Sequence, residues 1–304
     1  MSSPIIISIG GGKGGVGKSS ITANIGALLI RKSFTVGFID ADLGGANLHL
    51  CLGIRRPATG LQDYLSGKFK SLHEVAVPTA LPSSWLISGA SDILELANPN
   101  YSQKKKVIKN LAALNADFIL VDLGAGSDNH VTDFFAAFPY GIIVTDGLPT
   151  SIENAYGFIK NGILRGLSNL FTGNKELQAS IKRFSDPTHK RQFGTVTEML
   201  EQLSPLYPEE VKTMRVWLNQ RKTLLILNMV KDPDDVKVGL RFTEMVKKYL
   251  YINMYYIGYI ILTPDMRKAI KMLMPLIEHF PESPAVNCFE SVTNNLLTLT
   301  RGHV

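Results

Sequence analysis

The chain has little cysteine, with Cys51 and Cys288 as its two cysteines in 304 residues. Two isolated cysteines cannot form a C-x-x-C motif within one chain, which argues against an iron–sulfur cluster or redox site of that type. Cys51 is expected in the core. No basic segment precedes the first apolar run, at residues 5–9, and this run is too short for a secretory or membrane segment. We therefore expect a cytoplasmic protein.

Internal repeats and low-complexity segments are also absent, and 45% of the residues are hydrophobic. Runs such as residues 5–9 and 118–121 are apolar at every position, which is typical of parallel strands covered by helices on both faces. Such runs alternate with helical patterns along the whole chain. The sequence therefore predicts a single α/β domain over residues 1–304, with a doubly wound, mostly parallel sheet.

The net charge of +6 is unevenly distributed, because basic residues outnumber acidic ones between Lys160 and Lys222. This polar, helix-prone stretch is longer than an ordinary crossover of about a dozen residues. We interpret it as a helical insertion at about residues 166–222. It can bind an acidic partner, a phospholipid surface or DNA, or simply be a solvated elaboration, and the sequence leaves these alternatives open.

Residues 10–19 contain the most specific pattern in the chain. Gly12 to Ser19 satisfy G-x-x-x-x-G-K-[ST], directly after an apolar run and directly before a helical pattern. A glycine turn at the start of a helix presents backbone N–H groups and the helix dipole to phosphate oxygens. Lys18 is expected to neutralise phosphates and Ser19 to be a magnesium ligand. The predicted nucleotide-binding residues here are Gly12, Gly14, Gly15, Val16, Gly17, Lys18, Ser19 and Ser20.

Acidic residues follow two further predicted strands. Asp40 and Asp42 come after residues 34–39, and Asp122 ends the apolar run 118–121. The carboxyl ends of parallel strands lie at the edge of the sheet that holds the ligand in such folds. A carboxylate that follows an apolar strand can hold magnesium through a water molecule.

The segment from Lys13 to Ser19 also reads K-G-G-x-G-K-[ST], and in this it resembles the deviant phosphate loop of the MinD/ParA family of ATPases. The resemblance implies an ATP-bound homodimer in which Lys13 reaches the partner's nucleotide and helps catalysis together with Lys18. It assigns Asp40, Asp122 and Ser19 to the magnesium site, and Asp42 to positioning the attacking water. Gly124 and the segment 149–156 look most like the flagellar-number regulators of this family, the FlhG/FleN type.

The base is expected to be adenine, so that ATP, ADP and Mg²⁺ are the predicted cofactors. Guanine selectivity needs N-K-x-D, and the nearest match, at residues 174–177, ends in leucine. Asn228, Pro264 and Asp265 follow later strands at places that match where the family holds adenine. The alternative, that Asn228 and Asp265 cap turns or helices, stays open.

The carboxyl-terminal helical pattern, from Val286 to Leu299, carries only Arg301 as a nearby cation, so we expect it to pack on the core rather than on a membrane. The leading hypothesis is a dimerising ATPase switch that regulates flagellar number or placement. The resemblance implies protein partners such as an FlhF-type GTPase or flagellar switch proteins. The alternatives are a ParA-like DNA partition ATPase and a nucleotide-bound scaffold that does not hydrolyse ATP.

Overall fold

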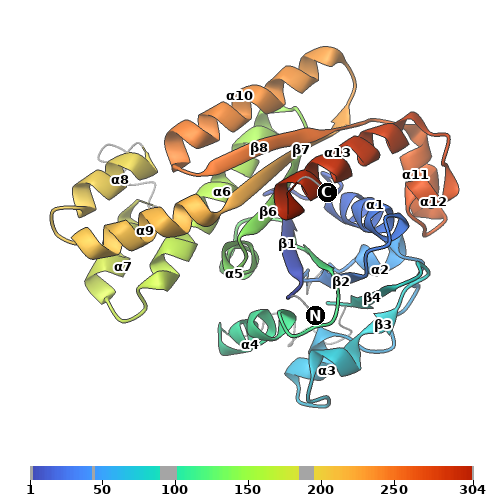
Figure 1. Ribbon diagram of the computed structural model, residues 1–304, viewed down its shortest axis with the longest axis horizontal. Coiled ribbons are helices and arrows are strands. Elements are labelled where there is room, and N and C mark those ends of the chain that lie inside the picture. Colours follow the sequence, from blue (N-terminus) through green and yellow to red (C-terminus); the bar gives the residue numbers. More distant parts are fainter. Residues whose placement is uncertain (1–2, 43–44, 90–100, 185–194, 303–304) are drawn as a thin grey trace.

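The computed structural model describes residues 3–42, 45–89, 101–184 and 195–302, and all of its strands lie in one sheet (Figure 1). The strand order is β3-β4-β2-β5-β1-β6-β7-β8, and only β3 runs antiparallel to its neighbour among the pairs in the described residues. The strands are β1 (Ile5–Gly10), β2 (Val36–Asp40), β3 (Val77–Pro78), β4 (Ser84–Ile87), β5 (Phe118–Asp122), β6 (Tyr140–Thr145), β7 (Lys222–Val230) and β8 (Asn253–Ile261). This confirms the predicted fold class.

Helices cover both faces of the sheet and enclose two separate apolar clusters. Successive side chains of a strand point to opposite faces, so Phe118 and Leu120 enter one cluster while Ile119 and Val121 enter the other. The Phe118 side of the sheet is covered by α1 (Lys18–Arg31), α2 (Leu48–Cys51), α11 (Pro264–Lys271), α12 (Leu276–His279) and α13 (Pro284–Arg301). The other side is covered by α3 (Leu61–Leu65), the short 3₁₀ helix η1 (Leu72–Val75), α4 (Tyr101–Leu111), α5 (Asn129–Ala137), α6 (Pro149–Leu170) and α10 (Pro233–Leu250).

The stretch interpreted as an insertion is helical where the structure describes it. It contains α7 (Lys175–Arg183), α8 (Val196–Leu203) and α9 (Pro208–Gln220), which extend beyond the end of α6 in Figure 1, and residues 185–194 lie outside the described part. Buried side chains such as Leu177, Met199 and Met214 join the cluster beneath α6. Within the described residues, these helices therefore share a hydrophobic core with the sheet, and the single domain stays a prediction.

The last helix, α13, packs on the sheet. Phe289, Val292 and Leu296 are fully buried against β8 and α1, as expected for a core-packing tail. Within the described residues, no helix combines the length and the apolar character needed to cross a bilayer.

Candidate nucleotide-binding site

The glycine loop joins β1 to α1, and its conformation depends on glycine at two positions. Gly12 has φ of 69°, and a Cβ there would lie 2.3 Å from the carbonyl oxygen of Asn154 in α6. Gly17 has φ of 90°, and a Cβ there would lie 2.3 Å from Nδ2 of Asn228. Since an L-residue resists both the left-handed backbone and the contact, these glycines let the loop wrap tightly between α6 and β7.

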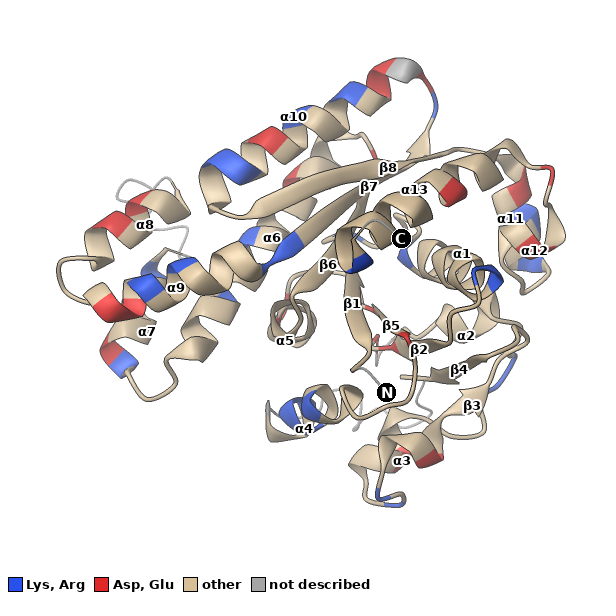
Figure 2. Ribbon diagram, in the orientation of Figure 1, with Lys and Arg blue, Asp and Glu red and all other residues tan. Residues whose placement is uncertain are grey.

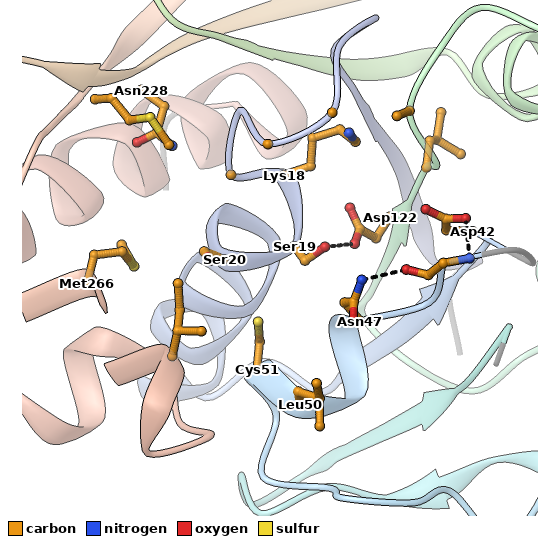
Figure 3. Close-up of a pocket in the computed structure, with 18 of the residues that line it drawn as sticks. Lys18, Ser19, Ser20, Asp42, Asn47, Leu50, Cys51, Asp122, Asn228 and Met266 are labelled. Atoms are coloured by element: carbon orange, nitrogen blue, oxygen red, sulfur yellow. Dashed lines mark hydrogen bonds between the residues drawn. The ribbon is translucent and has the colours of Figure 1, made fainter. Parts of the chain in front are cut away.

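Lys18 and Ser19 begin α1 and point into the site (Figure 3). The Lys18 ammonium donates to the Lys13 carbonyl at 3.3 Å, and burial lowers the pKa of Lys18 while the charges of Asp122 and Asp42 oppose that shift. Ser19 Oγ donates to Asp122 Oδ2 at 2.6 Å. The first turn of α1 thus presents one buried cation and one hydroxyl beside a carboxylate.

Asp40 and Asp122 lie side by side because β2 and β5 are neighbouring parallel strands in which these two residues are paired. Both are almost completely buried. Burial raises the pKa of Asp40 well above its usual value, and the charge of Asp122 raises it further. Burial also raises the pKa of Asp122 to about 7, against the opposing effects of the Ser19 hydrogen bond and the Lys18 charge. Two neighbouring buried carboxyls repel each other when both are ionised, so the pair favours a cation beside it.

Asp42 lies two residues beyond the end of β2 and is only partly buried. Its Oδ1 accepts the backbone N–H of Gly45 at 2.9 Å (Figure 3). A Cβ at Gly124 would lie 3.3 Å from the Asp42 carboxyl carbon, so the glycine at 124 leaves room for this carboxylate. Asp42 is therefore held at the open side of the site, between two glycine backbones.

These groups surround a cavity of about 520 Å³. The predicted residues that line it are Gly14, Gly15, Gly17, Lys18, Ser19, Ser20, Asp40, Asp42, Asp122 and Asn228. Asn228 lies in β7, and its Nδ2 donates to the Val16 carbonyl at 2.8 Å. The structure therefore brings together residues from four widely separated segments.

Other predicted residues do not line the cavity, namely Gly12, Lys13, Val16, Pro264 and Asp265. At the last two positions the wall is formed by their neighbours Thr263 and Met266. Asp265 instead forms an ion pair with Lys268 at 3.0 Å in the first turn of α11. Pro264 and Asp265 thus lie in the first turn of α11, whose N-cap is Thr263, and contact of either residue with adenine stays a prediction.

Lys13 points away from the cavity. Its Nζ donates to Ser151 Oγ at 3.2 Å, in the first turn of α6. In this arrangement the ammonium does not contact the phosphate side of its own site, and its role across a dimer stays a prediction.

The sequence does not predict several residues that line the cavity, because no motif marks them. The apolar part of the cavity includes Met229, Leu262, Met266 and Ile270, and Cys51, which packs against the core as expected, also lines it. Cys51 is half-buried, and burial raises the pKa of its thiol to about 11. In the sequence these residues are ordinary apolar positions in β7, α2 and α11 and directly after β8, and only the packing of those elements turns them toward the cavity.

The arrangement fits a magnesium-bound nucleoside triphosphate. Gly14, Gly15 and Gly17 of the loop line the cavity, and Lys18 supplies positive charge beside them. The hydroxyl and carboxylate oxygens of Ser19, Asp40 and Asp122 are the hard oxygen donors that magnesium prefers. The apolar wall beyond Asn228 gives a planar base a surface to pack on.

Known proteins are similar to this chain in sequence. Residues 4–146 match the family described as ParA: NUBPL iron-transfer P-loop NTPase. The antiactivator FleN of Pseudomonas aeruginosa is 24% identical over 294 residues, which is 96% of this chain and 85% of FleN. The flagellum site-determining protein YlxH of Helicobacter pylori is 36% identical over 156 residues, which is 51% of this chain and 52% of YlxH.

Solved structures agree on the fold. The septum site-determining protein MinD complexed with Mg-ADP from Pyrococcus horikoshii matches with a TM-score of 0.65 and 20% identity over 98% of both chains. The sheet order and the loop between β1 and α1 define a P-loop NTPase. Within that class, the chain is similar to the ParA and MinD proteins over residues 4–146, and to the flagellar protein FleN over most of its length.

Proposed function

We propose that this protein is a cytoplasmic ATPase switch that binds ATP with magnesium, dimerises in that state, and hydrolyses ATP to ADP and phosphate. The observation that carries the proposal is the Ser19–Asp122 hydrogen bond of 2.6 Å, with Asp40 beside it and Lys18 in the same turn. These groups stand in one place although more than one hundred residues of chain separate Ser19 from Asp122.

Each residue has a separate task in the proposed reaction. Lys18 and the N–H groups of Gly14 to Ser19 bind the phosphates, and Ser19, Asp40 and Asp122 hold magnesium directly or through water. Magnesium neutralises charge on the phosphates when it is bound. Asn228 and the apolar wall with Met266 hold adenine, and Asp42 orients the attacking water from the open side of the site.

Phosphate release tests the proposed hydrolysis. Asp42→Ala is expected to bind ATP with unchanged affinity and to release phosphate at least about tenfold more slowly, because it removes only the water-positioning group. Asp63→Ala is the matched control, since Asp63 forms a local ion pair with Lys68 and does not line the cavity. Equal rates for wild type and Asp42→Ala would remove Asp42 from this role. If both rates were zero although ATP bound, the scaffold alternative would be correct.

Light scattering tests the proposed dimer. Lys13→Ala is expected to bind ATP and remain a monomer, because the ammonium would no longer be available to the partner's phosphates. Lys32→Ala removes an exposed lysine at the end of α1 and serves as the control. An ATP-dependent dimer that is unchanged in Lys13→Ala would contradict the cross-subunit role.

We further propose that the switch regulates flagellar number or placement, which is supported by the similarity to FleN and YlxH. ATP-dependent binding to an FlhF-type GTPase or to flagellar switch proteins is the expected result. The basic excess of residues 160–222 favours DNA partition as the second candidate. ATP-dependent binding to random DNA that weakens steeply with salt would support that candidate instead.

A further inference from the structure

A second cavity, of about 250 Å³, lies between α4, α5, α6 and α9 and shares no lining residue with the nucleotide site. Much of its wall is apolar, with Ile108 from α4, Ala137 from α5, Leu170 from α6 and Trp217 from α9. Leu170 and Ala137 are exposed, so the apolar wall continues to the surface. The cavity is smaller than the range of about 300–1,000 Å³ typical of small-molecule sites. Its size therefore suits a side chain from another protein better than a cofactor.

Trp217 is held rigidly at this cavity. A Cβ at Gly166 would lie 2.3 Å from the Trp217 ring. Because glycine has no side chain, the indole can lie directly on α6. The Arg221 guanidinium lies 4.6 Å from the ring centroid, and it is itself fixed by hydrogen bonds to the carbonyls of Ala136 and Phe135. A fixed, half-buried tryptophan loses little conformational entropy on binding, which is why this residue is common at the centre of protein interfaces.

The charges around the cavity select the partner. Asp133, the carboxylate in the cavity lining, is engaged by Lys104 at 2.8 Å and by Arg165 at 2.6 Å. Lys105 lines the cavity and is exposed, and Lys109 is exposed one turn further along α4. No acidic residue occurs in α4, whose cations stand out in Figure 2. The edge of the cavity therefore favours a partner that carries negative charge.

We propose that this cavity is the docking site for an acidic amphipathic helix of a partner protein. The helix inserts one bulky apolar side chain beside Trp217 and sets its carboxylates against Lys105 and Lys109. This is helix-in-groove recognition, in which apolar anchors supply affinity and the flanking charges supply orientation. The proposal does not depend on nucleotide binding, since no residue of the nucleotide site takes part.

Selection from a displayed random-peptide library on the full chain, without nucleotide, tests the proposal. The enriched peptides are expected to combine acidic residues with leucine, phenylalanine or tryptophan. Their Kd is expected to rise at least tenfold on the double variant Lys105→Glu/Lys109→Glu. The double variant Lys247→Glu/Lys248→Glu makes the same charge change at two exposed positions of α10 and should bind the peptides like wild type.

The fluorescence of Trp217 tests whether the peptide binds at this cavity. The chain has two tryptophans, so Trp85→Phe leaves Trp217 as the one emitter, and peptide binding should shift its emission to shorter wavelength as the indole is covered. Peptides without acidic enrichment, equal Kd values for both charge variants, or unchanged Trp217 emission would each overturn the proposal. Loss of binding to anionic phospholipid vesicles in Lys105→Glu/Lys109→Glu, with peptide binding unaffected, would assign α4 to a lipid surface instead. Phosphate release by this variant should equal that of wild type, which separates this test from that of the proposed function.

Discussion

Asp133→Asn should destabilise the fold strongly, because Asp133 is the shared partner of two cations between α4, α5 and α6. Its side chain is 4% exposed, and it accepts from Lys104 Nζ at 2.8 Å and from Arg165 Nε at 2.6 Å. Asparagine has nearly the same shape and removes only the charge. Arg165, with 25% of its side chain exposed, can turn toward water, whereas Lys104, with 7% exposed, is left as a buried cation.

Breaking a buried ion pair by removing one partner costs about 3–5 kcal/mol. Because one of the two cations can reach solvent, we expect a loss near the lower end, about 3 kcal/mol. With an unfolding entropy of about 2.1 cal/mol/K per residue, a chain of 304 residues should then lose about 5 °C in Tm. Urea unfolding should show a lower midpoint with an unchanged slope.

A second variant separates the ion pair from general damage to the core. Lys104→Met added to Asp133→Asn removes the stranded cation, so the double variant should be more stable than Asp133→Asn alone. Asp234→Asn is the control, since its pair with Lys237 is exposed and such pairs contribute at most about 1 kcal/mol. A loss below about 1 kcal/mol for Asp133→Asn, or losses that simply add in the double variant, would refute the reasoning.

Three further outcomes are expected. Burial alone would raise the pKa of Asp133, but the hydrogen bonds and charges of Arg165 and Lys104 outweigh it and lower that pKa. The stability difference between wild type and Asp133→Asn should therefore be constant above about pH 4, the pKa range of an unfolded aspartate, and shrink as the pH falls below it, as measured by urea unfolding at each pH. Gly17→Ala should weaken ATP binding at least about tenfold by calorimetry, because φ is 90° and the new Cβ meets the Asn228 amide; Gly67→Ala, with φ of 82° and open space, should leave affinity unchanged. Tyr256→Phe should keep or raise stability by up to about 1 kcal/mol, since the described residues offer its buried hydroxyl no hydrogen-bond partner, whereas Tyr64→Phe should lose stability because Asn110 donates to the Tyr64 hydroxyl at 3.0 Å.

The sequence could locate the glycine loop and the carboxylates at the cavity because their placement follows from local patterns. The loop from Gly12 to Ser19 must follow a strand and begin a helix, and the structure has β1 and α1 there. Asp40 and Asp122 could be placed because the rule for parallel strands brings their carboxyl ends to one edge of the sheet.

The sequence located the residues expected near the base less closely relative to the cavity. Asn228 lines the cavity, but at the next strand end Thr263 and Met266 line it in place of Pro264 and Asp265. A shift of one residue at a helix start changes which side chain faces the cavity, and the sequence pattern places such boundaries only within a few residues. Cys51 packs against the core as expected, but it also lines the cavity, which its apolar neighbours in α2 do not reveal.

The sequence by itself determined the alternation of strands and helices, the glycine loop and the carboxylates after two strands, because each of these follows from local periodicity or spacing. The tertiary structure decided which residues from separate segments meet. The Asp40–Asp122 pairing follows from strand order, the direction of Lys13 toward Ser151 from the position of α6, and the Trp217 cavity from the way α9 packs on Gly166. These contacts depend on how elements far apart in the chain pack together, and no local pattern in the sequence specifies that packing.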